Sequence, residues 1–199
     1  EHPVTEMISS VDLVEQQIKI ASGEKLKINQ EDLSISGHAI ELRVYAEDSY
    51  NDFIPSIGKI TEYKIPSGKG IRVDSGFRKG MEVKIFYDPM LSKLAVHADT
   101  RQAAIQLMRE AISMYKINGV QTTLPFGDFV MSHPAFIRGD FDTHFVNNYF
   151  TKESHSKSNH NERIVSSYLA AQLMERHKQG LILHENKNDS WKENRKLYS

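Results

Sequence analysis

Residues 37–48, GHAIELRVYAED, alternate strictly between apolar and polar side chains. A period of two predicts a β-strand with one face against a core and one polar face. Strands that are buried on one side only are typical of antiparallel sheets. The apolar face would consist of Ile40, Leu42, Val44 and Ala46, and the polar face of Glu41, Arg43 and Tyr45.

Glycines and prolines separate short β-branched stretches between residues 53 and 98. This punctuation predicts several short strands joined by turns, with Leu91–His97 as the last strand. The segment PSGKGIR, residues 66–72, lacks the spacing of a phosphate-binding loop. It is predicted to be the turn of a β-hairpin.

Helical periodicity precedes and follows these strands. Apolar residues recur at helical spacing over residues 5–22, which predicts one helix there. Residues 99–115 have the clearest pattern, with Asp99 or Thr100 as the cap. Further helices are predicted near residues 123–131, 143–150 and 162–178.

Central strands with helices toward both ends predict an α+β fold. We expect an antiparallel β-sheet, or a small barrel-like sheet, flanked by helices and followed by a C-terminal helical tail. Residues 1–150 would form the main domain, 151–162 a polar linker and 163–199 the tail. The charged end, 180–199, has no assignable role from its sequence.

Composition limits the possible functions. With 25 basic and 26 acidic residues, the net charge of −1 lacks the basic excess of nucleic-acid-binding proteins, so no nucleic-acid partner is expected. No apolar run approaches the roughly 20 residues of a membrane span, so no membrane partner is expected either. The chain has no cysteine, which excludes disulfides and cysteine zinc sites and is compatible with the cytoplasm or another reducing compartment.

Few residues stand out as chemical groups. The 9 histidines are scattered without metal-binding spacing, so no metal site is predicted. Arg43 on a strand could stabilise a developing anion, or form a surface ion pair with Glu41 or Glu47. Lys69 and Arg72 could form a subunit contact, or could be solvated charges. The pattern alone gives no chemistry to the first residue.

Three collinear stretches resemble biotin carboxylases, which are ATP-dependent ligases that carboxylate biotin. The chain opens with EHPVTEMISSVDLVEQQIKIASGE, continues with GHAIELRVYAED and FIPSIGKI, and then reads FYDPMLSKLAVHADTRQAAIQLMREAI and NGVQTTLPF. Together they cover about residues 1–150. The resemblance is to the C-terminal domain of the family.

This resemblance implies roles for two residues. Glu1 corresponds to the glutamate that deprotonates bicarbonate, and Arg43 to the arginine that binds bicarbonate and stabilises the biotin anion. The carboxyl group would pass to N1 of protein-bound biotin. The parent enzyme would use ATP, Mg²⁺ or Mn²⁺, and biotin on a carrier domain. The residues that bind nucleotide and metal lie upstream in the family, so the isolated chain is expected to be inactive and to bind none of these tightly.

The resemblance also implies partners. Lys69 and Arg72 match a turn and strand through which bacterial members dimerise, so a homodimer is expected, although some relatives carry phenylalanine at the position of Lys69. SSYLAAQLMERHKQG resembles the start of the subunit-interaction domain of propionyl-CoA carboxylase α chains; a plain linker helix is the alternative. The expected partners are therefore a biotin carboxyl carrier domain and a carboxyltransferase subunit.

Several functions follow from this resemblance. The leading interpretation is the biotin carboxylase component of an acetyl- or propionyl-CoA carboxylase, as in fatty acid metabolism. Pyruvate and urea carboxylases share the same half-reaction and remain alternatives. A different class is a non-catalytic module that dimerises or docks partner subunits.

Overall fold

The computed structural model describes residues 1–151 and 164–175. The chain divides into two compact units, Glu1–Asp142 and Thr143–Ser199, which are described separately. Among the described residues, all strands belong to the first unit. No helix in these two ranges is both long enough and apolar enough to cross a membrane.

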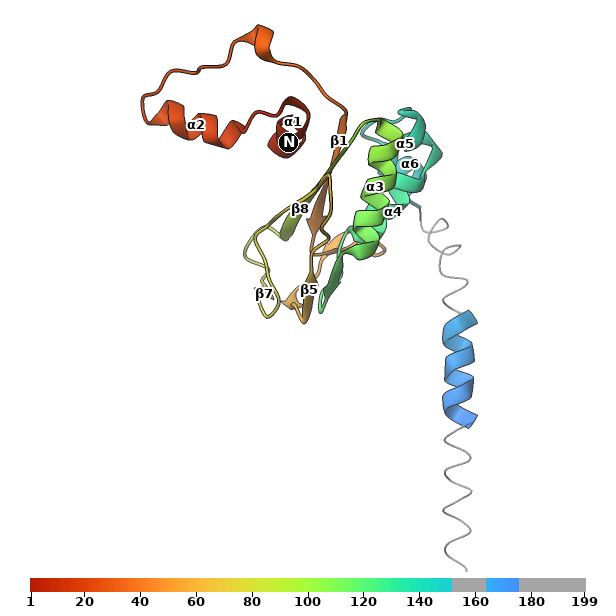
Figure 1. Ribbon diagram of the computed structural model, residues 1–199. Helices are drawn as coiled ribbons and strands as arrows, with labels where there is room; N and C mark the ends of the chain where they lie inside the picture. Colours follow the sequence, from red (N-terminus) through yellow and green to blue (C-terminus); the bar gives the residue numbers. More distant parts are fainter. Residues whose placement is uncertain (152–163, 176–199) are drawn as a thin grey trace, which may run out of the picture. The chain divides into compact units, whose positions relative to one another are not determined.

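The first unit is built on small antiparallel sheets (Figure 1). Its largest sheet has the strand order β1-β8-β6, with β8 in the centre. The α+β prediction is confirmed; in the described chain, one three-stranded sheet and three two-stranded sheets do not close into a barrel. The large sheet comprises β1 (His38–Tyr45), β8 (Met90–Ala98) and β6 (Ile71–Ser75). The two-stranded pairs are β2 (Glu47–Asp48) with β3 (Ile54–Pro55), β4 (Gly58–Lys59) with β7 (Glu82–Val83), and β5 (Glu62–Lys64) with β9 (Lys116–Asn118).

The two faces of β1 are as predicted. Ile40 and Val44 are buried and belong to the main core, against which Leu42 packs. Helix α3 (Arg101–Met114) covers this face, and its Met108 is completely buried. The Thr100 side chain accepts a hydrogen bond from the amide of Ala103, so Thr100 rather than Asp99 is the cap.

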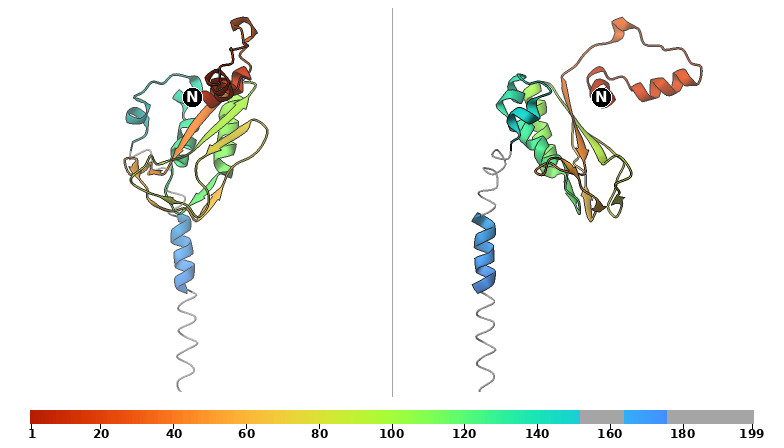
Figure 2. Two further views of the ribbon diagram at one scale, coloured as in Figure 1. Left: turned by 90° about the vertical axis from the view of Figure 1, so that its left-hand side faces the viewer. Right: turned by 180° about the vertical axis from the view of Figure 1, so that it is seen from behind.

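The N-terminal segment differs from the prediction of one helix. It forms two helices, α1 (His2–Ser9) and α2 (Leu13–Ala21). Ser10 adopts a left-handed conformation with φ 59°, and Asp12 caps α2 by accepting from the amide of Glu15. The side chains of serine and aspartate bond to nearby backbone and so favour helix ends over interiors. The break allows α1 to lie on the sheet while α2 extends away from it (Figures 1 and 2).

The segment 66–72 is a turn but not a hairpin, which corrects the prediction. The Ile71 amide donates to the carbonyl of Gly68, as a β-turn requires. However, β5 pairs with β9 whereas β6 pairs with β8, so the turn passes from one sheet to another. Gly70 has φ +76° and lies directly against the carbonyl of His97, a position where an added Cβ would collide.

The helices after α3 are largely as expected. Helix α4 (Leu124–Ser132) matches the predicted 123–131, and α6 (Phe145–Tyr149) in the second unit matches 143–150. Helix α5 (Pro134–Arg138) was not predicted; the proline at its first position and Gly139 at its end set its limits. Residues 164–175 are helical, in agreement with the predicted tail helix. The predicted linker, apart from residue 151, and the segment 180–199 lie outside the described residues.

Candidate functional site

Glu1 and Arg43 lie next to each other. Glu1 immediately precedes α1, and Arg43 projects from the polar face of β1. Guanidinium Nη2 of Arg43 lies 3.6 Å from carboxylate Oε1 of Glu1. The Glu1 side chain is 96% exposed and that of Arg43 47% exposed. The two residues that resemblance singled out therefore form an ion pair that is open to solvent.

Glu41 is the third member of this cluster. Its side chain is only 10% exposed, its Oε1 lies 3.5 Å from Nε of Arg43, and its Oε2 lies 3.6 Å from the backbone nitrogen of Glu1. Within the described chain, that buried Oε2 accepts no hydrogen bond. The sequence indicated only a surface partner for Arg43, because periodicity cannot tell a solvated face from one covered by a helix.

The surroundings of Arg43 favour its charged form. Interaction with Tyr45, followed by the contact with Glu41, raises the pKa of the Arg43 guanidinium above its ordinary value. A charged, oriented guanidinium binds oxyanions through paired N–H donors. A neighbouring exposed carboxylate can accept a proton from a weak acid. The cluster thus has the groups needed to deprotonate a small oxyacid and hold its anion.

A second ion cluster holds α1 on the sheet. Arg72 of β6 donates from Nη1 to Oε2 of Glu6 at 2.6 Å, and from Nε and Nη2 to Asp74 at 2.9 and 2.8 Å. Oε1 of Glu6 accepts from the amide of Leu13 at 3.0 Å. Glu6 is 9% exposed, and sequence reasoning missed it because a glutamate in a helix is usually solvated.

The sequence matches two family models. Residues 41–148 match the biotin carboxylase C-terminal domain, which is more than half of the chain. The chain belongs to the biotin carboxylase C-terminal domain family. Residues 1–29, which contain α1 and α2, match the carbamoyl-phosphate synthase L chain ATP binding domain.

Named relatives of this biotin carboxylase domain are components of biotin-dependent carboxylases. A pyruvate carboxylase subunit of Methanothermobacter thermautotrophicus is 52% identical over 149 residues, which cover 75% of this chain and 30% of that protein. The propionyl-CoA carboxylase α chain of Ruegeria pomeroyi is 45% identical over 166 residues, which cover 73% of this chain and 24% of that protein. The chain thus spans less than a third of these relatives.

A solved structure is also similar to this domain. The biotin carboxylase domain dimer of Hydrogenobacter thermophilus 2-oxoglutarate carboxylase, in complex with MgADP, ADP and bicarbonate, has a TM-score of 0.74 and 44% identity. The similarity covers 75% of this chain and 33% of the other.

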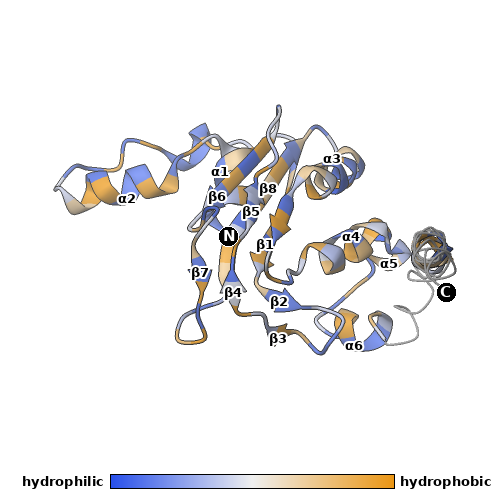
Figure 3. Ribbon diagram, turned by 90° about the horizontal axis from the view of Figure 1, so that it is seen from below, coloured by the Kyte–Doolittle hydropathy of each residue, from blue (hydrophilic) through white to orange (hydrophobic). Residues whose placement is uncertain are grey.

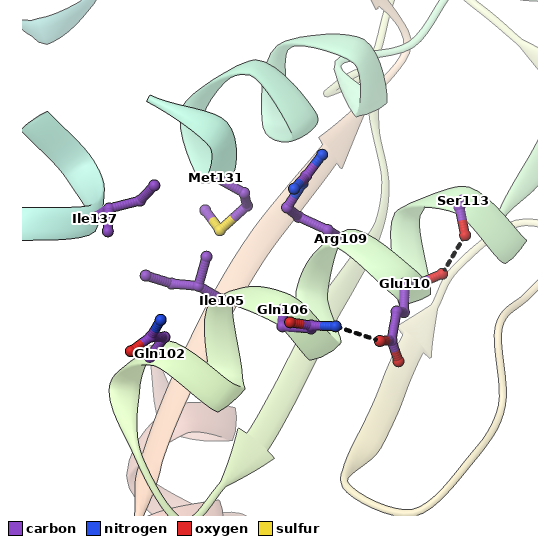
Figure 4. A pocket seen from close by; sticks show the side chains of 8 residues that line it. All are labelled: Gln102, Ile105, Gln106, Arg109, Glu110, Ser113, Met131 and Ile137. Atoms are coloured by element: carbon purple, nitrogen blue, oxygen red, sulfur yellow. Dashed lines mark hydrogen bonds between the residues drawn. The ribbon is translucent and has the colours of Figure 1, made fainter. Parts of the chain in front are cut away.

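A groove of this biotin carboxylase domain lies away from the ion pair. It has a volume of about 430 Å³ and lies beside α3, with Met131 and Ile137 contributed by the following helices (Figure 4). Glu1, Glu41 and Arg43 are not among its lining residues. In the described ranges, no group of three or more histidine, cysteine, aspartate or glutamate side chains is arranged to hold a metal ion.

The predicted interface residues have different surroundings. Lys69 is exposed in the turn before β6, whereas Arg72 is engaged within its own chain by Glu6 and Asp74. Their proposed place in a dimer interface stays a prediction. The observed contacts give Arg72 an intramolecular role that the sequence did not indicate.

The ion pair of Glu6 predicts a pH-dependent attachment of α1. Burial raises the pKa of Glu6, but the hydrogen bonds from Arg72 and from the amide of Leu13 outweigh it, and the net pKa is lowered from 4.5. The stabilisation is therefore complete above pH 4.5 and is lost as the pH falls through the folded-state pKa. We expect hydrogen exchange in α1 to rise on acidification below about pH 4.5, after correction for the intrinsic exchange rate. An equally large acid-induced rise in exchange in Glu6→Gln, which has no carboxyl group to protonate at this position, would contradict this assignment.

Proposed function

We propose that this chain supplies the bicarbonate- and biotin-binding part of a biotin carboxylase. Glu1 acts as the base that takes the proton of bicarbonate, and Arg43 holds the resulting anion and later the biotin anion. The observation that carries the proposal is the 3.6 Å approach of Glu1 and Arg43, from separate elements, at an open surface. The bicarbonate in the related structure supports the class of anion.

The chemistry follows from the charges of the cluster. Proton transfer from bicarbonate to the Glu1 carboxylate leaves a doubly charged carbonate, which the positive charge of the Arg43 guanidinium stabilises. Glu41 lies 3.5 Å from that guanidinium on the same strand. Biotin, when bound, supplies the ureido nitrogen that accepts the carboxyl group. The described residues offer no cluster for the metal ion, so no step through ATP and its metal is assigned to them.

The rest of the ATP-binding domain is proposed to cover α2. This helix has no buried residue, and Ile18 and Ile20 are 65% and 50% exposed. Ile20, Leu26 and Leu33 line an apolar groove of about 430 Å³ between α2 and the following segment. Figure 3 shows the apolar stretches along α2. Since residues 1–29 match part of an ATP-binding domain, the remainder of such a domain is the natural cover for this surface.

Reconstitution tests the proposed function. The purified chain would be mixed with the separately expressed ATP-binding region of the same enzyme, and carboxylation of free biotin would be followed with labelled bicarbonate. We expect carboxylation and biotin-dependent ATP hydrolysis in the mixture and neither from residues 1–199 alone, because phosphoryl transfer requires a nucleotide and metal site.

The Glu1→Gln variant separates catalysis from docking. It keeps the shape of the side chain but cannot accept the proton, so the reconstituted enzyme should lose activity while still forming the complex. Full activity of Glu1→Gln would favour the non-catalytic docking module. ATP hydrolysis by the purified chain alone would also contradict the proposal.

For the parent enzyme we propose an acetyl- or propionyl-CoA carboxylase in the cytoplasm. The propionyl-CoA carboxylase relative supports this choice, while the pyruvate carboxylase relative keeps that enzyme as the alternative. The helical residues 164–175 expose the apolar side chains of Tyr168 and Leu169, which suits a segment that binds a carboxyltransferase subunit. A carrier domain would bring biotin to Arg43.

We also propose that the chain forms a homodimer through the turn containing Lys69 and the following strand. The dimeric related structure supports this assembly. Light scattering of the purified chain measures its molar mass, which gives the number of chains in the assembly.

A further inference from the structure

Helix α1 depends on contacts outside itself for its position. It has eight residues, and only Pro3 and Glu6 among them are buried. A helix this short is unstable alone in water, so tertiary contacts decide where it lies. Glu1 immediately precedes this helix. The position of Glu1 relative to Arg43 is therefore set by whatever holds α1 on the sheet.

The strand register aligns the two attachment points of α1. Ala95 of β8 is opposite Glu41 of β1 on one side and opposite Arg72 of β6 on the other. These three residues form one row across the polar face of the sheet. Glu41 contacts Glu1 at one end of the row, and Arg72 contacts Glu6 at the other.

The helix has the length needed to bridge this row. Two strand spacings amount to roughly 10 Å, and five residues of α-helix rise by roughly 7.5 Å, with the side chains covering the difference. Ala95 in the middle of the row is fully buried although it lies outside the main core cluster. Helix α1 contacts both β1 and β8, and the small side chain of Ala95 leaves room for it.

We propose that Arg72 is a positioning residue, which through Glu6 holds α1 across the sheet so that Glu1 reaches Arg43. The catalytic meaning of this contact rests on the proposed function. Arg72 suits the task because two of its nitrogens are fixed by Asp74 on its own strand, which aims the third at α1. The Glu1 end of the helix is held by the buried Pro3, by the more exposed pair with Arg43 and by the contact with Glu41.

The test uses the full chain labelled for NMR. Arg72→Met removes the ion pair and keeps much of the side-chain volume, and Lys79→Met removes an exposed cation from the turn after β6 as a matched control. Hydrogen exchange is followed at the amides of Thr5 and Ser10, which bond to carbonyls of α1 and its cap. We expect roughly tenfold to hundredfold faster exchange in Arg72→Met, with β8 and the control unchanged.

A double-mutant cycle tests whether Arg72 acts through Glu6. Glu6→Gln should reproduce most of the effect, and the double variant should add little to either single change. Arg72→Lys should restore part of the protection, because lysine can pair with Glu6 without the fork to Asp74. Additive effects of the two single changes would overturn the proposal.

The Nη2–H resonance of Arg43 reports the position of Glu1 directly, because Nη2 is the atom that approaches the Glu1 carboxylate. In Arg72→Met it should move toward its position in Glu1→Gln, because both changes remove the Glu1 carboxylate from the guanidinium. An unchanged resonance, or unchanged exchange in α1, would overturn the positioning role. Neither measurement uses bicarbonate, ATP or biotin, so failure of positioning and failure of the proposed carboxylation are distinguished.

Discussion

Replacing Arg43 with alanine is expected to lower biotin carboxylation by roughly 10²–10³-fold in the reconstituted enzyme, the usual cost of losing a donor to a developing oxyanion. Arg43 is the cationic member of the cluster with Glu1 and Glu41, and its removal leaves two carboxylates facing the anion. The loss should affect both binding of bicarbonate and the later transfer to biotin. Initial rates at varied bicarbonate concentration measure it.

Two further variants sharpen this prediction. Arg43→Lys keeps the charge but loses the paired donors and the simultaneous contacts with Tyr45 and Glu41, so it should recover only a small part of the activity. Arg78→Ala removes an exposed arginine from the turn after β6 and should leave the rate unchanged. Arg43→Ala with at least half of the original activity would contradict the proposed role.

Replacing Leu94 with alanine is expected to lower the free energy of unfolding of the first unit by roughly 2–5 kcal/mol. Leu94 is completely buried in the central strand β8, opposite Leu42 on one side and Val73 on the other. Truncation removes apolar contacts and leaves a cavity between the sheet and α3, where close packing prevents easy collapse. Urea unfolding followed by circular dichroism measures the change.

Leu169→Ala provides the matched control. Leu169 is 53% exposed in the helical residues 164–175. Its replacement by alanine should therefore change the free energy of unfolding of the first unit by no more than about 0.5 kcal/mol. Similar effects of the two substitutions would mean that Leu94 does not lie in the centre of the core. At temperatures where the Leu94→Ala variant is still folded, reconstitution should give active enzyme. Leu94 belongs to the core face of the sheet, whereas Arg43 lies on the opposite face.

Much of the fold was accessible from local sequence patterns. The alternation around Arg43 predicted β1 and its buried face, since a strand places successive side chains on opposite sides. The apolar stripe after Thr100 predicted α3 for the corresponding reason at helical period. Predictions that required knowledge of distant partners were less successful. The turn containing Gly70 was predicted as a hairpin, yet its flanking strands pair with β9 and β8.

Identification of the candidate site required both the family resemblance of the sequence and the contacts in the structure. Resemblance selected Glu1 and Arg43, but only the structure brings them to 3.6 Å and adds Glu41 as a buried neighbour. Glu6 and Arg72 had no local signal of their connection, because their contact joins an N-terminal helix to a strand far along the chain. Polar residues on a predicted strand face are normally interpreted as solvated.

The sequence by itself determined the family, the α+β class and the apolar face of β1, because each is encoded in short-range order along the chain. Only the tertiary structure decided that the opening helix ends at Ser9, that the small antiparallel sheets of the described chain do not close into a barrel, and that Arg72 engages Glu6. These features depend on which surfaces meet after folding. Hydrogen bonds and ion pairs between distant segments have no period in the sequence from which they could be predicted.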